Sequence, residues 1–467
     1  MTTLRRRGLA IRAFKKGPDF IDPAWLGRAA GSVCRNLDTY LVAPDDVRAS
    51  FLTHATGCDL ALIEGNRGLF DGQDAVGTHS TARLAKLLGA PVVLVINVTK
   101  TTRTIAALVK GCVDFEPDIT IAGVILNRVA GERHGRVISE AVIEATGLPV
   151  LGMLPKLGDN AAVIPGRHLG LVPPEELSAD ASYEDRLVEI GENFLNIDRL
   201  LRIADDTQAL PEPAVKPKSP PTASIRLAYF HDSVFTFYYP ENLEALQAGG
   251  AELVPISSIR DRDLPDVDGL YIGGGFPETQ ADQLTANRDM MEAVKLAAED
   301  GMPIYAECGG LIYLSRSITW QGKKHLMAGV FPLDLAMSPR PVGHGYAEVS
   351  VEAPNPFFGT SDVVRGHEFH YSSPVGELGG VNTGLAVRRG VGVGDGRDGL
   401  LCDRVMACYM HIHASGVSGW AKRFVAAGLA YRNDRRSRRS SSATAGNELD
   451  EGHESKSHPS LRNVMGW

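Results

Sequence analysis

The sequence predicts two α/β domains, each built on a doubly wound sheet of parallel strands. Three observations support this prediction. The chain has 467 residues, which is too long for one ordinary core. In both halves, short apolar runs alternate with longer helical segments. A proline-rich stretch without apolar periodicity, residues 204–224, lies between the halves and is typical of a linker.

Buried parallel strands are expected wherever a short run is rich in branched aliphatic residues. In the first half these runs are residues 59–64, 91–97 and 121–127, with helical segments at 80–88 and 102–113. The polar residues that end the three runs are Glu64, Asn97 and Asn127. Because ligands bind at the carboxyl ends of the strands in such sheets, these side chains are candidates for a ligand site.

The second half repeats the alternation. Its strand candidates are residues 225–230, 269–272 and 303–307. The predicted organisation is a first domain over 1–203, a linker over 204–224, a second domain over 225–432 and a disordered tail over 433–467. The arginine- and serine-rich cluster that opens the tail is interpreted as a solvated segment.

Composition excludes several classes of protein. The net charge is −8, which argues against a nucleic-acid-binding protein. The 6 cysteines form no CxxC pair, so neither a zinc ribbon nor a disulfide framework is indicated. No secretory signal and no apolar stretch long enough to span a bilayer is found. A cytoplasmic protein that binds no membrane is expected.

One cysteine has the context of a catalytic nucleophile. Cys308 lies between an apolar strand candidate and an apolar helical run and is followed by Gly309 and Gly310. This is the strand–turn–helix pattern of a nucleophile elbow, and the helix N-terminus is expected to lower the pKa of the thiol. A buried structural thiol is the alternative.

Two further segments complete the pattern. Gly274 and Gly275 end another strand candidate, where backbone N–H groups, with that of Gly309, can bind an oxyanion. His411 lies far downstream and is the candidate general base, with His413 on the same strand face as the alternative.

Two other histidines, His367 and His370, flank a glutamate. They suggest either a metal site or, as we favour, a structural strand.

The three pieces around Cys308 resemble the class I glutamine amidotransferase domains, and more narrowly their cobyric-acid-synthase-like branch. The Ala-Glu-Cys-Gly-Gly elbow and the Gly-Gly-Gly-Phe-Pro-Glu strand end carry the resemblance. The branch's Tyr-x-His motif implies that His411 is the catalytic histidine. An acidic third member of the triad is usually absent from this branch, and none is assigned.

The first half carries Phe14-Lys-Lys-Gly-Pro-Asp-Phe-Ile-Asp-Pro23, Arg35-Asn-Leu-Asp38, a glutamate-led motif at 64–72 and Pro165-Gly-Arg-His-Leu-Gly-Leu171. With the second half, these motifs resemble the cobyrinic acid a,c-diamide synthase family from Ala10 to about Ala430. The resemblance implies a P-loop-NTPase-like, dethiobiotin-synthetase-like first domain. It also implies that ATP activates tetrapyrrole carboxylates, that ammonia from glutamine forms the amides, and that Mg²⁺ participates.

The resemblance also assigns residues. Lys15 matches the lysine beside the phosphates, and Asp38 and Glu64 match acidic positions that organise magnesium. Asp19 and Asp22 match positions where substrate and nucleotide meet. Asn127 flanks the adenine pocket. The alternatives are that Lys15 is a surface charge and that Asp19 and Asp22 cap turns next to prolines.

One element of the family pattern is missing. Members begin with a strand and a glycine-rich phosphate loop ending in Gly-Lys-Thr, and no such motif is found here. Either the start was assigned too late, which we favour because a sheet without its central strand leaves backbone groups unpaired, or the synthetase half is impaired. The polypeptide as given is expected to bind ATP poorly and to keep its glutaminase activity.

Other functions remain open. The same chemistry could act on sirohydrochlorin, nickel-sirohydrochlorin, sirohaem or hydrogenobyrinate. A different class is a ligand-binding protein with a defunct synthetase half. Helical faces such as that of residues 80–88 could pack within the chain or between the subunits of a homodimer.

Overall fold

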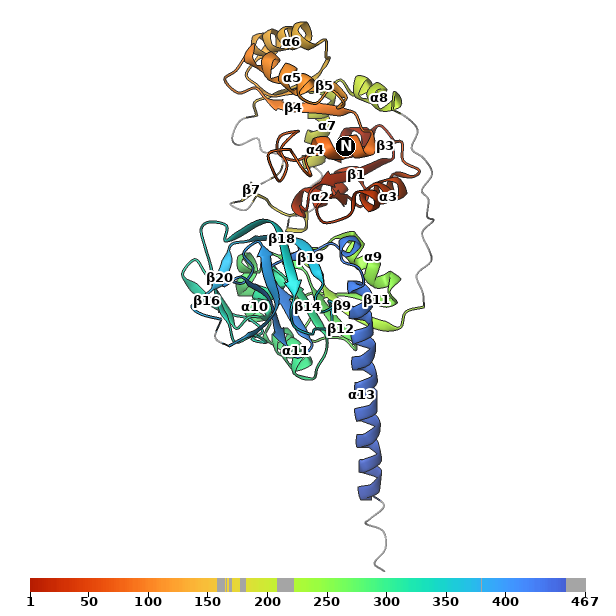
Figure 1. Ribbon diagram of the computed structural model, residues 1–467, viewed down its shortest axis with the longest axis vertical. Helices are drawn as coiled ribbons and strands as arrows, with labels where there is room; N and C mark the ends of the chain where they lie inside the picture. Colours follow the sequence, from red (N-terminus) through yellow and green to blue (C-terminus); the bar gives the residue numbers. More distant parts are fainter. Residues whose placement is uncertain are drawn as a thin grey trace, which may run out of the picture.

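The computed structural model describes residues 1–157, 164, 166–167, 170–176, 182–207, 222–378 and 380–450. They form two lobes, one above the other, with a long C-terminal helix that points away from both (Figure 1). Most of the predicted linker lies outside the described residues, as do residues 165, 168 and 169 of one motif and residues 451–467 of the predicted tail.

The N-terminal lobe alternates strands and helices as predicted. Its elements are α1 (Thr2–Arg6), β1 (Ile11–Lys16), α2 (Ile21–Ala30), β2 (Arg35–Leu37), α3 (Pro44–Ala55), β3 (Leu60–Glu64), α4 (Thr81–Leu88), β4 (Val92–Asn97), α5 (Thr104–Phe115), β5 (Ile121–Val129), α6 (Glu132–Thr146), β6 (Val150–Pro155), β7 (Gly166–Arg167), β8 (Gly170–Leu171), a 3₁₀ turn (Pro174–Glu176), α7 (Ser182–Phe194) and α8 (Ile197–Asp205).

The parallel strands of this lobe form two sheets rather than one. The orders are β2-β1-β3 and β4-β5-β6. Among the described strands, β3 pairs only with β1 and β4 pairs only with β5, so each has one unpaired edge. All five residues of β3 are only half-buried, and Val95 of β4 is 62% exposed. The edges of β3 and β4 therefore leave backbone groups without a strand partner.

Local signals explain the helix boundaries. The side chain of Ser80 accepts a hydrogen bond from the Arg83 N–H at the start of α4, and Gly89 ends this helix in the left-handed conformation, with φ 65°. These are the usual N-cap and C-terminal residues of a helix.

The C-terminal lobe contains β9 (Ile225–Phe230), β10 (Phe235–Phe237), α9 (Pro240–Ala248), β11 (Ala251–Ile256), β12 (Gly269–Ile272), β13 (Gly274–Gly275), a 3₁₀ turn (Pro277–Gln280), α10 (Ala281–Ala286), α11 (Arg288–Glu299), β14 (Ile304–Glu307), α12 (Gly309–Leu314), β15 (Ser317–Trp320), β16 (Lys323–Leu326), β17 (Asp334–Met337), β18 (Gly343–Val351), β19 (Val363–His370), β20 (Ser372–Pro374), β21 (Asn382–Arg389), β22 (Arg397–Cys402), β23 (Val405–Cys408), β24 (His411–Ile412), a 3₁₀ turn (Ala414–Gly416) and α13 (Trp420–Asp450).

A ten-stranded sheet with the order β11-β9-β12-β14-β23-β22-β21-β18-β19-β24 forms the centre of this lobe. The first five strands in this order, β11, β9, β12, β14 and β23, are parallel, as predicted. The remaining strands are antiparallel, and a smaller sheet, β16-β15-β17-β20, lies beside them. All residues of β12 and β14 are buried, so the two strands that lead to the predicted glycines and cysteine are in the core.

The prediction of a disordered tail from residue 433 is wrong up to Asp450, because α13 continues through this segment. Arg435 contacts Asp266 at 2.7 Å, and Arg438 contacts Asp300 at 2.9 Å. The basic cluster therefore has acidic partners on the body of the lobe. Sequence reasoning missed them because they lie more than a hundred residues away.

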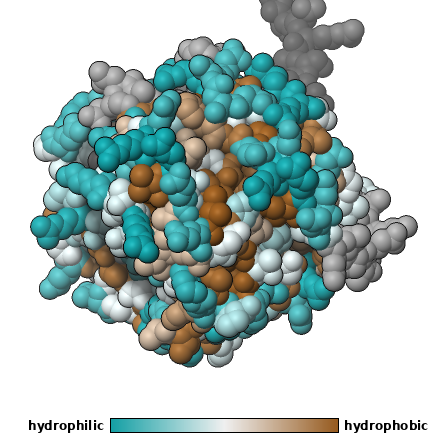
Figure 2. Space-filling view, turned by 90° about the horizontal axis from the view of Figure 1, so that it is seen from above, coloured by the Kyte–Doolittle hydropathy of each residue, from teal (hydrophilic) through white to brown (hydrophobic). Residues whose placement is uncertain are grey.

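Apolar side chains are visible at the end of the N-terminal lobe that lies farthest from α13 (Figure 2). The exposed large apolar residues of β4, α5, α6 and β6 are Val95, Leu108, Phe115, Val137, Ile143 and Met153. Within the described residues, none of the helices is both long and apolar enough to cross a membrane.

Candidate functional site

Cys308 occupies a sharp turn between β14 and α12. Its backbone has φ 48° and ψ −98°, a conformation that non-glycine residues rarely adopt. The Cys308 N–H donates to the Cys408 carbonyl at 2.7 Å, and the Cys308 carbonyl accepts from the Ile312 N–H at 3.2 Å. Backbone strain of this kind costs about 1–3 kcal/mol and is concentrated at functional sites. The predicted elbow geometry is therefore present.

The predicted glycines lie between the cysteine and the histidine. A Cβ atom on Gly309 would lie 2.9 Å from the Gly275 nitrogen, and one on Gly274 would lie 2.5 Å from Cε1 of His411. The β13 backbone thus contacts both the residue after Cys308 and the imidazole ring. The fold brings the nucleophile, base and glycines together, and their roles stay predictions.

The thiol of Cys308 is less acidic than the sequence predicts. The Gly309 N–H at the start of α12 lowers the pKa of the thiol, as expected, but burial and the carboxyl group of Glu278 outweigh this effect and raise the pKa. The sulfur lies 3.8 Å from the Phe369 carbonyl oxygen. Because a buried thiol does not ionise readily without help, a base has to take its proton.

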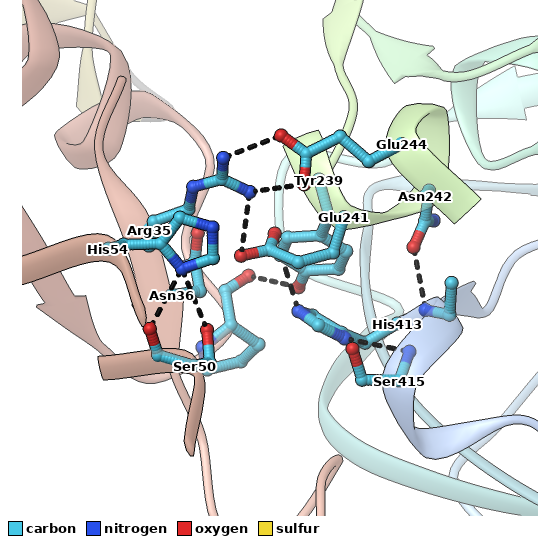
Figure 3. A network of polar contacts seen from close by, with 12 residues as sticks. Arg35, Asn36, Ser50, His54, Tyr239, Glu241, Asn242, Glu244, His413 and Ser415 are labelled. Carbon is cyan, nitrogen blue, oxygen red and sulfur yellow. Dashed lines mark hydrogen bonds and ion pairs between the residues drawn. The ribbon is translucent and has the colours of Figure 1, made fainter. Parts of the chain in front are cut away.

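The two candidate bases have different surroundings. The His411 ring contacts Gly274, as described above, whereas His413 lies at the boundary between the lobes (Figure 3). Nε2 of His413 lies 3.6 Å from the Glu241 carboxylate, and Nδ1 accepts a hydrogen bond from the Ser415 N–H at 3.3 Å. His413 therefore faces Glu241 and the lobe boundary, whereas His411 faces the β13 glycines, which favours His411 as the base.

Sequence reasoning missed the acidic neighbour of His411. Oε2 of Glu307 lies 3.3 Å from Nδ1 of His411. Burial raises the pKa of Glu307, so its carboxylate form is favoured only when a positive charge lies beside it. Burial, together with nearby His370, lowers the pKa of His411 to about 3. The position of Glu307 directly before the cysteine was the available signal.

His367 and His370 contact other side chains and backbone of the protein. Nδ1 of His370 lies 2.9 Å from the Ser372 carbonyl oxygen, and its ring stacks on that of Tyr409 at 3.7 Å. Nδ1 of His367 lies 3.2 Å from the Tyr239 hydroxyl. In the described part of the chain, no group of three or more His, Cys, Asp or Glu side chains is arranged to hold a metal ion. The geometry supports the structural interpretation.

A second polar cluster lies at the carboxyl ends of β1 and β3. Nζ of Lys15 lies 2.7 Å from Asp22 and 3.4 Å from Glu64. Burial disfavours the ammonium charge, but the hydrogen bond to Asp22 and the charge of Glu64 outweigh it, so the pKa of Lys15 is raised. Lys15 is thus a buried cation rather than the surface charge of the alternative.

Asp38 is placed differently from Glu64. One oxygen of Asp38 accepts hydrogen bonds from the N–H groups of Tyr40 and Leu41, and the other accepts from the Tyr346 hydroxyl at 2.8 Å. Both oxygens are therefore used within the protein. This arrangement favours a structural role at the lobe boundary over the predicted role as a metal ligand.

Asp19 and Asn127 also fit local roles. Oδ1 of Asp19 accepts hydrogen bonds from the N–H groups of Ile21 and Asp22, which is the turn-capping alternative. Asn127 pairs with Asn97 between β4 and β5 and lies two residues before the end of β5. It is therefore on the other sheet from Lys15, and its predicted place beside adenine is untested.

The N-terminal lobe also reaches the cysteine site. The ring centroid of Phe20 lies 5.0 Å from that of His411, 4.5 Å from that of Tyr239 and 5.1 Å from that of Phe237. Phe20 lies between Asp19 and Asp22 in sequence. The start of α2 therefore contributes Asp22 to the Lys15 cluster, and its N-cap residue Phe20 contacts the histidine of the other lobe.

Ion pairs join the two lobes close to Phe20 (Figure 3). Arg35 of β2 contacts Glu244 at 2.5 Å and Glu241 at 3.3 Å, both on α9. The amide of Asn242, also on α9, donates to the Ile412 carbonyl at 2.9 Å. Helix α9 thus connects the N-terminal lobe to the strand that carries His411.

Comparison with known proteins gives consistent results. The family described as the CobB/CobQ-like glutamine amidotransferase domain matches residues 226–418, and an AAA domain family matches residues 37–162. The chain is 44% identical to a cobyrinate a,c-diamide synthase of Magnetococcus marinus, over 90% of each chain. It is 38% identical to one of Archaeoglobus fulgidus, over 91% of this chain and 92% of that one. A solved glutamine amidotransferase shares 20% identity, covering 43% of this chain and 98% of its own, with a TM-score of 0.33. The chain belongs to the cobyrinate a,c-diamide synthase family.

Proposed function

We propose that this chain catalyses the ATP-dependent, glutamine-hydrolysing amidation of the a and c carboxylates of cobyrinic acid. Its relatives carry this activity in their names, and the two family matches fit a ligase with an amidotransferase domain. The observation that carries the proposal is the position of Phe20. It is the N-cap residue of α2, the helix that supplies Asp22 to the Lys15 cluster, and it contacts His411.

In the glutaminase half, Cys308 is the nucleophile. His411 takes the thiol proton, and the sulfur attacks the amide carbonyl of glutamine. The N–H groups of Gly274, Gly275 and Gly309 are the candidate donors to the oxyanion. His411 returns the proton to the leaving nitrogen, so that ammonia departs and a thioester remains. Water then hydrolyses the thioester to glutamate and restores the thiol.

In the synthetase half, a carboxylate oxygen of the tetrapyrrole attacks the γ-phosphorus of ATP and releases ADP. Ammonia then attacks the acyl phosphate and displaces phosphate, which forms the amide. Lys15 is suited to neutralise phosphate charge because it is a buried cation that the Asp22 and Glu64 carboxylates hold in place. A second cycle on the other side chain gives the a,c-diamide.

Magnesium fits only part of the predicted ligand set. The side chain of Glu64 is 44% exposed at the end of β3 and offers a carboxylate oxygen, the kind of ligand that Mg²⁺ prefers. One or two carboxylates suffice when phosphates and water supply the rest. When bound, the ion would neutralise phosphate charge. Asp38 is not included, because protein donors occupy both of its oxygens.

The substrate is tested by incubating the protein with ATP, glutamine and each of five tetrapyrroles, followed by mass spectrometry. The panel is cobyrinic acid, hydrogenobyrinic acid, sirohydrochlorin, its nickel complex and sirohaem. We expect amide formation with cobyrinic acid. Amidation of another member alone would change the substrate, and glutamine binding without any turnover would favour the ligand-binding alternative.

The remaining partners follow from this reaction. Glutamine, ATP and the tetrapyrrole are the small-molecule substrates, and the cytoplasm is the compartment in which they meet and in which unpaired cysteines stay reduced. The exposed apolar residues of β4, α5 and α6 support the expected homodimer. Light scattering of the purified protein tests it, with a monomeric mass as the contrary result.

A further inference from the structure

Glu307 is enclosed at the centre of the glutaminase site. Its exposed fraction is 1%. Oε1 accepts a hydrogen bond from the Ile412 N–H at 3.2 Å, and Oε2 accepts one from the Tyr271 hydroxyl at 3.1 Å. The same Oε2 lies 3.3 Å from Nδ1 of His411. The carboxyl group is therefore fixed from two sides with one oxygen directed at the imidazole.

His411 is the only basic group that pairs with this carboxylate among the described residues. A buried carboxylate without a cation is costly, and so is a buried imidazolium. Each charge is therefore favoured when the other is present. The imidazolium forms when His411 takes the proton of Cys308, so the carboxylate matches the charge that appears at that step.

The geometry also sets the tautomer of the histidine. An Nδ1–H directed at Glu307 leaves the lone pair on Nε2, the nitrogen that lies nearer to the β13 glycines. A Cβ atom on Gly274 would lie 3.2 Å from this Nε2. The free nitrogen therefore faces β13, which also approaches Gly309 of the Cys308 elbow.

From these contacts we infer that Glu307 is a positioning residue. It holds His411 in the tautomer that accepts the thiol proton, and it stabilises the imidazolium, taking the place of the acidic residue that other triads carry elsewhere in the chain. This inference rests on the proposed glutaminase reaction. The nucleophile and the acid are then adjacent residues, and the turn between β14 and α12 positions both side chains.

The competing view is that Glu307 only ties strands together through Tyr271 and Ile412. Two variants separate the possibilities. Glu307→Gln keeps the shape and an acceptor for the Ile412 N–H but removes the charge. Tyr271→Phe removes one hydrogen bond to Glu307 and keeps the carboxylate. Glu368→Gln is a matched control, because Glu368 is also buried, and one of its oxygens lies 3.7 Å from His370.

The first readout is glutamine hydrolysis by the chain alone. We expect Glu307→Gln to lower kcat by at least about tenfold, with ~10⁴-fold, the loss known for a serine enzyme, as the upper bound. KM for glutamine should change little, and Glu307→Asp should restore part of the rate. Tyr271→Phe and Glu368→Gln should stay within about threefold of the parent, on the scale of a single modest hydrogen bond.

The second readout is the pH dependence of Cys308 alkylation by iodoacetamide, followed by mass spectrometry of the Cys308 peptide. The titratable groups around the pair are Tyr238, Tyr239, Tyr271, Tyr305, Cys308, Cys408, His367 and His370. Removing the negative charge of Glu307 makes His411 less basic, so the acidic limb of the profile should move to lower pH in Glu307→Gln alone.

An unchanged kcat and an unchanged alkylation profile in Glu307→Gln would overturn the inference. So would equal losses and equal pH shifts in Glu307→Gln and Tyr271→Phe. Alkylation requires no glutamine, so this failure is distinct from a failure of the proposed function, in which the parent protein would hydrolyse no glutamine at all.

Discussion

Phe20 of the N-terminal lobe packs against His411 of the C-terminal lobe, with ring centroids 5.0 Å apart. Two residues later, in the first turn of α2, Asp22 contacts Lys15 at 2.7 Å. The proposed ammonia source and the proposed phosphate-binding lysine are therefore joined by one short segment. A change in the Lys15 cluster can reach the histidine through contacts that already exist.

The split between β3 and β4 predicts a weak nucleotide site. An N-terminal extension that supplies one parallel strand and a phosphate loop, here called the extended chain, should pair both free edges and add backbone N–H donors for phosphate. Calorimetry should show ATP affinity at least about tenfold higher in the extended chain, or roughly 1.4 kcal/mol. Equal affinities in the two forms would contradict this account of the split.

Replacing Phe20 by Ala should uncouple the two reactions. Without the ring, ammonia formed near His411 can escape at the lobe boundary. The contact that transmits changes in the Lys15 cluster to His411 is also lost. In the extended chain, the glutamate formed per amide should rise by about fivefold or more, the lower end of usual coupling between sites. Phe115→Ala, at a ring that is 69% exposed, is the control. An unchanged ratio in Phe20→Ala would remove the ring from the coupling.

Replacing Lys15 by Met should impair amidation while glutamine hydrolysis continues. The variant loses the cation held by Asp22 and Glu64, so amidation by the extended chain should fall by about 10²-fold or more, as for other lost electrostatic contacts in active sites. Glutamine hydrolysis should be retained. Lys110→Met, at a side chain that is 58% exposed, should affect neither activity. Parallel loss of glutaminase in Lys15→Met would indicate misfolding instead.

The boundary ion pairs predict an acid-labile fold. Burial alone would raise the pKa of Glu241, but His413 and Arg35 outweigh it and lower it to about 2. A lowered pKa means that this stability is complete above about pH 4.5 and is lost as pH falls towards 2. The loss is roughly 3 kcal/mol. Urea unfolding across this range should show it, and Glu241→Gln should flatten the profile. An equally steep profile in that variant would exclude Glu241 as its source.

Local patterns predicted much of the fold. The apolar runs that became β3, β4, β9 and β14 were recognisable because burial on both faces leaves little choice of side chain. Of the antiparallel strands between Ser317 and Cys402, only the one that carries His367 and His370 was predicted, although residues 343–351 also show an alternation of small or apolar and polar residues.

Site residues that stand in a local sequence motif were predicted. Roles that depend on contacts between residues far apart in the sequence were missed. Cys308 and His411 stand in recognisable motifs. The role of Asp38 depends on Tyr346, 308 residues away, and that of Glu307 depends on the fold of β24 beside it. Neither partner could be chosen from the sequence, because each contact exists only after the strands have paired.

The most direct test of the central claim follows nitrogen from glutamine to the tetrapyrrole. The extended chain and its Cys308→Ser variant are incubated with ATP, cobyrinic acid and glutamine labelled with ¹⁵N at the amide. We predict that the extended chain transfers two labelled nitrogens and that Cys308→Ser transfers none but uses added ammonia. Labelled amides formed by Cys308→Ser, or hydrolysis without amidation by the extended chain, would contradict the proposed function.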